Sequence, residues 1–167
     1  MKKIFLAKAT WCILLLTLVI SVTDGPSLSA ELESQSRNAA LTSAAWKAFN
    51  AGNYSEAIAT AWKVIDEFGE VAGRKQADLE KRQAPTPPKR ITTQGEKQKI
   101  FDRGLLNDAA TCWFIIGFSH EKLNHIAEAR NAFLKAAEYT YARAWDPRGW
   151  FWSPAEAAKN HLKVLGE

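Results

Sequence analysis

Apolar residues recur at steps of three and four in two separate parts of the chain. In the first part, these steps run through residues 40–49 and again through residues 58–68. Such spacing places the apolar side chains on one face of an α-helix. Gly52 stops the first run, and Asn53 is a typical start for the second. Because so short a turn joins the two runs, we predict an antiparallel helical hairpin over residues 38–68.

The same arrangement returns over residues 107–140. Small and large apolar residues occupy one helix face through residues 109–120 and another through residues 126–137. A polar turn at residues 123–125 separates them. Glu128 stands in the first turn of the returning helix, where the helix dipole favours an acid. We therefore predict a second antiparallel hairpin.

The segment between the hairpins, residues 69–106, lacks a clear apolar face. Residues 69–83 are charged and are compatible with an extension of the preceding helix, and residues 91–101 with a short helix of their own. Residues 84–90 contain three prolines, which exclude a helix because they remove backbone donors and restrict their neighbours. We predict an exposed connector there. A binding loop is the alternative, because long loops are often functional.

The C-terminal segment, residues 141–167, is rich in tryptophan and ends in a predicted helix. Ser153, Pro154 and Glu156 form a helix start, with a cap, a proline in the first turn and an acid three residues after the cap. The helix is expected to run to about Leu165 and to cover the open face of the second hairpin, as terminal units of helical stacks must be sealed.

Trp145, Trp150, Phe151 and Trp152 allow two interpretations. In the first, they fill the gap between the second hairpin and the final helix, since each buried tryptophan contributes a large apolar area. In the second, they form an exposed aromatic platform for a sugar or a peptide, with nearby arginines as polar contacts. The sequence leaves both interpretations open.

Both hairpins repeat one order of side chains: a large residue, a small one, a turn, and then small, aromatic and small residues. The second hairpin follows it at Trp113, Gly117, His120, Asn124, Ile126, Ala129, Phe133 and Ala136, and the first at Leu41, Ala45, Ala48, Gly52, Tyr54, Ala57, Ala61 and Val64, with Ala61 in the aromatic position. This order resembles the tetratricopeptide repeat, a helical hairpin of about 34 residues. The resemblance implies an all-α fold, a short α-solenoid of tetratricopeptide-like antiparallel hairpins with a C-terminal capping helix.

A helix that opens at Asn107 and Asp108, followed by the Trp-rich residues 145–152, resembles the arrangement in a group of bacterial exported repeat proteins, some of which are labelled beta-glucanase precursor. The resemblance covers most of the mature chain. A glycosidase needs two carboxylates that face one cleft. We interpret Asp108, Asp146 and Glu156 more simply as helix-start and turn residues. The sequence therefore predicts a protein without enzymatic activity, and a beta-glucanase-like or glycan-binding protein is the alternative.

Residues 1–30 have the character of a signal peptide. Lysines precede an apolar stretch over residues 11–22, and small residues before Ala30 offer a cleavage site. The alternative is an uncleaved membrane anchor. Because the segment carries three lysines and Asp24, its removal would take the net charge from +4 to about +2, without the clustered basic face that nucleic-acid binding requires. We expect an exported protein, periplasmic or secreted, with its mature domain over residues 31–167.

No residue pattern predicts catalysis, a cofactor or a metal site. Cys112 would be the single cysteine of the mature chain, and it lies in an apolar run where a small buried residue is expected. His120 and His125 are five residues apart, whereas two ligands on one helix face are three or four apart. Glycine-rich phosphate loops and nucleophile elbows are absent from the sequence.

The function that these observations favour is protein–protein interaction in the cell envelope. Stacked helical hairpins form a curved surface whose concave side receives a peptide or a partner helix. A short stack also favours self-association, which would lengthen that surface. We predict no nucleic-acid partner, and membrane contact only through an uncleaved N-terminal segment. The candidate partner contacts are Asn38, Lys47, Asn107, Arg143, Arg148 and Trp150.

Overall fold

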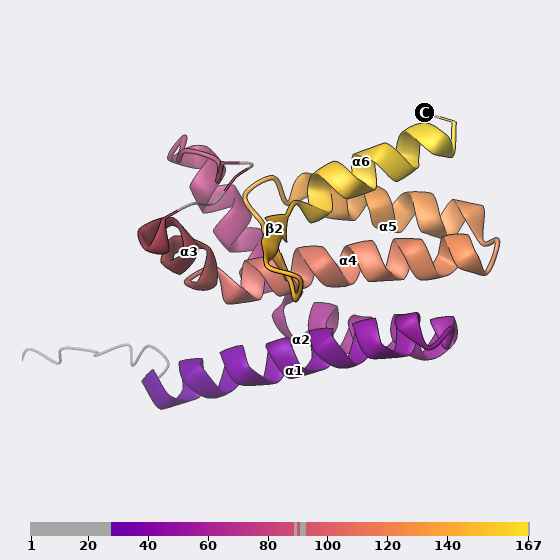
Figure 1. Ribbon diagram of the computed structural model, residues 1–167, viewed down its shortest axis with the longest axis horizontal. Helices are drawn as coiled ribbons and strands as arrows, with labels where there is room; N and C mark the ends of the chain where they lie inside the picture. The colour runs from indigo at the N-terminus through magenta and orange to yellow at the C-terminus, as the bar shows by residue number, and fades with distance from the viewer. Residues whose placement is uncertain (1–27, 89, 91–92, 167) are drawn as a thin grey trace, which may run out of the picture.

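The computed structural model describes residues 28–166 except Lys89, Ile91 and Thr92 (Figure 1). These residues are mostly helical, which confirms the predicted helical class and adds one small β-hairpin to it. None of their helices combines the length and the apolar character that a bilayer-crossing segment requires. The predicted signal peptide lies outside the described residues, except for residues 28–30, which belong to the first helix. In chain order the elements are α1 (Leu28–Asn50), α2 (Tyr54–Lys81), α3 (Gln94–Phe101), α4 (Gly104–Lys122), α5 (Ile126–Glu138), β1 (Ala144–Asp146), β2 (Trp150–Trp152) and α6 (Pro154–Val164).

The helices form two hairpins that stack on each other, α1 with α2 and α4 with α5 (Figure 1). Both α1 and α2 pack against α4, so α4 is the central helix of the molecule. Most of its side chains are buried in consequence. α6 packs along α5 and also contacts α4, and the β-hairpin crosses the first half of α4.

Tight turns reverse the chain within each hairpin. Gly52 has a φ of +80° between α1 and α2, and the N–H of Asn53 donates to the carbonyl of Ala48 at 2.9 Å. Asn124 has a φ of +60° between α4 and α5, a conformation that asparagine adopts more readily than most residues. Asn53 directly precedes α2, as predicted, although its side chain makes no capping hydrogen bond.

Two helices begin earlier than the sequence predicts. α1 begins at Leu28, ahead of the expected start at residue 38, because the polar residues before that point continue the helix. α4 begins at Gly104, ahead of the expected start at Asn107. The extension of α1 is mostly polar and that of α4 is only three residues long, so the spacing of apolar residues does not reveal them.

α2 continues to Lys81, so the charged residues 69–81 extend the preceding helix, the possibility that the sequence left open. Its inner face there consists of Ala72, Gln76 and Leu79, all buried. The Gln76 amide donates to the hydroxyl of Thr140 at 3.0 Å and accepts from the N–H of Tyr141 at 3.3 Å. A polar residue at a buried position interrupts the apolar pattern, so the sequence allows the extension but does not define its buried face.

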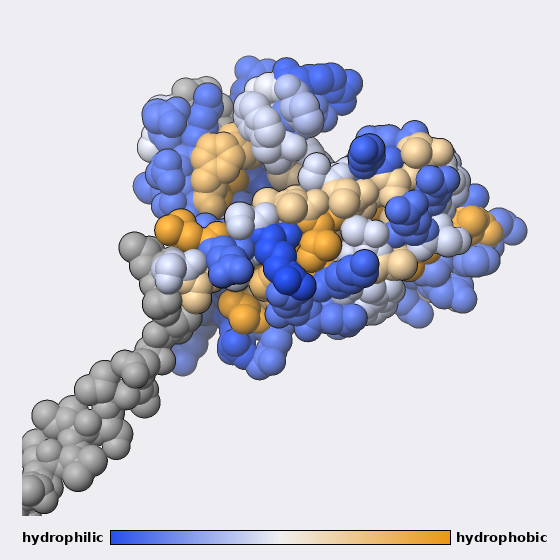
Figure 2. Space-filling view, turned by 90° about the horizontal axis from the view of Figure 1, so that it is seen from below, coloured by the Kyte–Doolittle hydropathy of each residue, from blue (hydrophilic) through white to orange (hydrophobic). Residues whose placement is uncertain are grey.

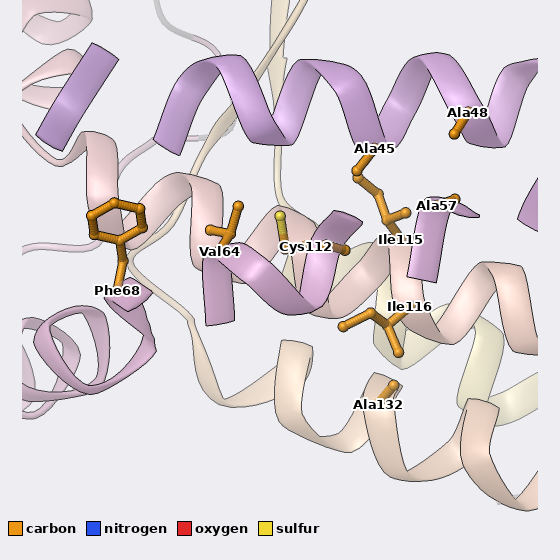
Figure 3. Close-up of a cluster of buried hydrophobic side chains, with 10 residues drawn as sticks. Ala45, Ala48, Ala57, Val64, Phe68, Cys112, Ile115, Ile116 and Ala132 are labelled. Atoms are coloured by element: carbon orange, nitrogen blue, oxygen red, sulfur yellow. The ribbon is translucent and has the colours of Figure 1, made fainter. Parts of the chain in front are cut away.

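A core of small and large apolar side chains joins the two hairpins. Figure 3 shows side chains of α1, α2, α4 and α5 directed into one space. Alanines of α1 and α2 let the helix backbones approach, while larger side chains such as Val64, Ile115 and Ile116 fill the space between them. Cys112 is buried in this core as predicted, and burial raises the pKa of its thiol to about 12.

The final helix covers the second hairpin, as predicted. Ser153 Oγ accepts a hydrogen bond from the N–H of Glu156 at 3.2 Å, which caps α6. The buried side chains of α6 pack in one cluster with those of α4 and α5. His161 Nδ1 lies 2.6 Å from Glu121 Oε2, so a polar contact also ties α6 to α4.

Part of the Pro-rich segment, residues 84–88, is held against the chain that precedes β1. Tyr141 Oη donates to the carbonyl of Ala84 at 2.9 Å. The Arg143 guanidinium donates to the carbonyl of Pro87 and to two carbonyls of its own segment, and burial lowers its pKa. The predicted connector is therefore attached to the rest of the fold at Ala84 and Pro87.

Replacement of Arg143 by methionine should loosen this attachment. Methionine keeps an unbranched stem but cannot donate to the carbonyls, and loss of hydrogen bonds from a charged donor should lower the free energy of unfolding by about 1–2 kcal/mol. Hydrogen exchange followed by mass spectrometry should be faster in residues 82–86. Arg148→Met, which changes an exposed arginine, should leave this exchange unaltered. Equal exchange in wild type and Arg143→Met would contradict the anchoring role.

Candidate binding groove

A groove of about 1040 Å³ lies between α1, the start of α4 and the β-hairpin. Its lining comes from residues 35–50, residues 100–114 and residues 143–157. Figure 2 views the molecule from the side of α1, where apolar and polar side chains are interspersed and the outline is indented. Because α1 and α4 are the first helices of the two hairpins, the groove lies on the face that these helices share.

The β-hairpin that forms one wall is shaped by a tight turn. Gly149 has a φ of +110°, which side-chain-bearing residues rarely adopt. Asp146 Oδ1 accepts from the N–H of Arg148 at 2.9 Å. The Asp146 carboxylate also pairs with the Arg148 guanidinium, and this hydrogen bonding lowers the pKa of Asp146. The predicted role of Asp146 as a turn residue is confirmed.

The aromatic residues of the β-hairpin divide between packing and exposure. Phe151 is buried, and Trp152 packs against Phe114 with ring centroids 5.2 Å apart. Trp145 and Trp150 are 45% and 46% exposed. Trp152 is therefore packed as the first interpretation predicts, whereas Phe151 is buried beside Phe101 of α3. Trp145 and Trp150 have the exposure that the second interpretation requires.

Asp108 brings a carboxyl group from α4 to the groove. Asn38 Nδ2 donates to Asp108 Oδ2 at 2.6 Å. Burial raises the pKa of Asp108 from its ordinary value of 3.8 to about 7. The ion pairs formed within the described part of the chain do not include Asp108. This carboxyl group therefore changes its charge near neutral pH.

Asn38 differs from its predicted role as a partner contact. It is fully buried between α1 and α4, so its side chain has no surface to offer a partner. Its backbone carbonyl accepts from the Thr42 hydroxyl at 2.9 Å, and its side-chain Oδ1 has no hydrogen-bond partner among the described residues. The prediction that Asn38 contacts a partner is therefore wrong. Asn38 is a buried residue that donates a hydrogen bond to Asp108.

The groove brings together four of the other predicted contacts and leaves Lys47 outside its lining, exposed on α1. The Asn107 amide donates to the carbonyl of Ile100 at 2.7 Å and accepts from the N–H of Arg143 at 3.0 Å, so it supports the groove wall. The four residues in the lining are Asn107, Arg143, Arg148 and Trp150.

Arg148 and Trp150 form an exposed pair at the turn of the β-hairpin. The guanidinium carbon of Arg148 lies 4.4 Å from the ring centroid of Trp150. A cation over an aromatic face is attracted by the electron density of the ring. These two predicted contacts remain accessible to a partner, unlike Asn38 and the buried Arg143.

Sequence reasoning missed the inner aromatic residues of the groove, Trp46 and Phe114, and misplaced Asp108. The sequence interpretation puts Asp108 at a helix start, whereas α4 begins at Gly104 and Asp108 stands in its second turn. A signal was present, because Asp108 is the first charged residue of α4 and the next one is Glu121. A lone acid among apolar residues of a central helix is expected to be at least partly enclosed by the neighbouring helices, as Asp108 is.

The described residues contain no group of three or more His, Cys, Asp or Glu side chains that could hold a metal ion. Of the three acids weighed as glycosidase residues, Asp146 pairs with Arg148, and Glu156 lines a smaller hollow of about 270 Å³ beside the groove. Two acids line the main groove, Asp108 and Asp146. Asp146 pairs with Arg148, whereas Asp108 has no cationic partner in the described part of the chain. No protein-family model, curated protein or solved structure matches the chain.

Proposed function

We propose that the protein is an interaction module whose groove binds an extended segment of a partner protein. The groove is the observation that carries this proposal, because it is open and has a volume of about 1040 Å³. Pockets for small molecules have volumes of about 300–1000 Å³, so this groove accommodates several residues of an extended chain. Its aromatic side chains and scattered polar groups suit a peptide, which needs apolar anchors and hydrogen-bond partners.

The two helical hairpins are, in this proposal, tetratricopeptide-like repeats. Helical repeats present concave binding surfaces, and the groove lies on the face that α1 and α4 share. The close packing of Gly117 against Phe133 supports the repeat-like alternation of small and large residues. Export to the cell envelope and self-association belong to the same proposal, and they are supported by the character of residues 1–30 and by the shortness of the stack.

Glycan binding is the second candidate, because Trp145 and Trp150 are exposed. A sugar platform requires exposed rings that face the same way. In an antiparallel hairpin, opposite residues share a face and successive residues alternate between faces. Trp145 stands opposite Phe151, and Trp150 stands opposite Asp146, so the two exposed rings project from opposite faces. This arrangement favours a peptide over a glycan as the ligand.

Selection from a display library of short random peptides against the purified protein tests the proposed function. Ser43 is exposed on α1 and lines the groove, so Ser43→Tyr should obstruct it and weaken the enriched peptides by about tenfold or more. Ala44, the next residue, is exposed and outside the lining, and Ala44→Tyr is the matched control that should keep full affinity. Affinities are measured by fluorescence anisotropy of labelled peptides.

The proposal fails if no peptide is enriched, or if the two tyrosine variants bind the enriched peptides equally well. A glycan array supplies the competing outcome. Glycans that bind the wild type and Ala44→Tyr but not Ser43→Tyr would support the second candidate.

A further inference from the structure

The chemistry of the groove indicates which side chain the bound segment presents. We infer that this segment carries a lysine or arginine whose cationic group forms an ion pair with Asp108 inside the groove. The inference rests on the proposed function and makes Asp108 the residue that selects the ligand. It is carried by the charges around Asp108, by the aromatic lining and by the hydrogen bonding of Asn38.

The charged side chains that share the groove with Asp108 are already engaged. They are Arg143, Asp146 and Arg148. The guanidinium of Arg143 donates to backbone carbonyls, including that of Pro87, and Arg148 pairs with Asp146. A partly buried carboxylate without a counter-ion is unfavourable, so a cation brought by a ligand would gain more here than at the protein surface.

The uncharged groups near Asp108 cannot supply that counter-ion. α1 contributes the amide of Asn38 and the hydroxyl of Thr42, and the latter lies 3.5 Å from the Cys112 sulfur. On α4, the Cys112 thiol stays neutral, because burial raises its pKa to about 12. The two groups shown to interact with Asp108, the Asn38 amide on α1 and the Cys112 thiol on α4, are therefore neutral.

The aromatic lining suits a cation as well. Trp46, Phe114 and Trp152 line the groove with Asp108, and Trp46 lies 6.2 Å from Phe114 and 6.3 Å from Trp152 between ring centroids. Aromatic faces attract ammonium and guanidinium groups, and the apolar stems of lysine and arginine pack against the same rings. An acidic side chain would be repelled by the Asp108 carboxylate, and a neutral one would leave it unpaired.

Asn38 is arranged to hold the carboxylate form of Asp108. Its amide nitrogen donates to Asp108 Oδ2, while its Oδ1 is buried without a hydrogen-bond partner among the described residues. The Asn38 side chain therefore presents a hydrogen-bond donor to Asp108, and such a donor favours the charged form of a carboxyl group. Because the pKa of Asp108 is about 7, a bound cation should draw off its proton, and affinity should fall as the pH decreases through this value.

The test uses the peptides that the display library yields and that Ser43→Tyr fails to bind. Each is resynthesised with its lysine or arginine replaced by glutamine. We expect every such peptide to contain a basic residue, and one replacement to weaken binding by about tenfold or more. The parent peptides should bind Asp108→Asn about tenfold more weakly than they bind the wild type. The glutamine replacement should then weaken binding to this variant little further, because the two changes remove the same ion pair.

Two controls separate this ion pair from general effects. Asp146→Asn removes an acid that already pairs with Arg148, so the preference for a basic residue should remain. The affinity of the wild type for these peptides should fall as the pH is lowered from about 8 to about 6, whereas the affinity of Asp108→Asn should not change. Circular dichroism establishes that both variants are folded, and the peptide replacements in the wild type do not depend on either variant.

Enriched peptides without a basic residue would overturn the inference and leave the proposed function standing. Independent, additive effects of Asp108→Asn and the glutamine replacement would also overturn it, because they would place the cation elsewhere. If no peptide is enriched, the inference and the proposed function fail together.

Discussion

Replacing Gly117 with alanine is expected to lower the free energy of unfolding by about 2 kcal/mol, although alanine is the better helix former. A Cβ atom at this position would lie 2.7 Å from Cδ1 and 2.8 Å from Cε1 of Phe133. Phe133 is fully buried, so its ring cannot move aside without displacing its neighbours. Overpacking at such distances should lower the free energy of unfolding by about 3 kcal/mol, and the higher helix propensity of alanine should offset about 1 kcal/mol of this loss.

Gly73→Ala is the matched control in α2. There the nearest atom to an added Cβ is Tyr139 Oη at 4.0 Å, so alanine should fit and raise the free energy of unfolding by about 0.5–1 kcal/mol. Urea denaturation of the wild type and both variants measures the two effects. If Gly117→Ala were as stable as Gly73→Ala, α4 and α5 would have to tolerate a wider separation than their packing indicates.

The close approach at Gly117 belongs to the part of the fold that the sequence predicts. Gly117 and Phe133 occupy the small and large positions of one hairpin, and only the turn at residues 123–125 separates their helices. Local spacing therefore contains most of the information about this contact. The same holds for α6, whose start at Ser153 and Pro154 is signalled by adjacent residues.

The β-hairpin could not be predicted in the same way. Each strand has three residues, too few for an alternating pattern to stand out. Its aromatic residues also have divided roles, because Phe151 is buried while Trp150 is exposed. Composition alone cannot assign those roles, since they depend on which face of the hairpin meets α4 and α1.

The environment of Asp108 depends on contacts between distant parts of the chain. Asn38, which donates to it, is 70 residues away in the sequence. An acid near the start of a helix is usually solvated, and the helix dipole stabilises its negative charge. Here the packing of α1 against α4 buries it, so the raised pKa is a property of the tertiary structure. The sequence predicts the helices around the groove but not the charge state of the acid within it.

That charge state leads to the second large effect. Asp108→Asn should raise the free energy of unfolding on the order of 3 kcal/mol near pH 8, where wild-type Asp108 is a partly buried carboxylate. An asparagine removes the charge and keeps the shape. Its oxygen can accept from Asn38 Nδ2, and its amide nitrogen can donate to Asn38 Oδ1, which lacks a partner among the described residues of the wild type. Both amides would then be paired.

The pH dependence of wild-type stability follows from the direction of the shift. The pKa of Asp108 is raised from 3.8 to about 7 in the folded protein, so between these values the folded state holds a proton that the unfolded state has lost. Stability should therefore increase as the pH falls from about 7 to about 4, by up to about 1.4 kcal/mol per pH unit, and this contribution should be constant below about 4. Asp108→Asn lacks this contribution, so its advantage should shrink steadily over the same range.

Urea denaturation of the wild type, Asp108→Asn and Asp146→Asn at several pH values tests this account, because other titrating groups cancel in the differences. Asp146 has a lowered pKa through its bonds to Arg148, so its contribution has the opposite sign, present at neutral pH and lost in acid. Asp146→Asn should accordingly bring no gain near pH 8. A stability difference between Asp108→Asn and wild type that does not change with pH would show that Asp108 titrates normally. If Asp108→Asn is more stable than the wild type and no longer prefers basic peptides, Asp108 lowers the stability of the fold and also selects the ligand. Such a loss of stability in favour of binding is expected at functional sites.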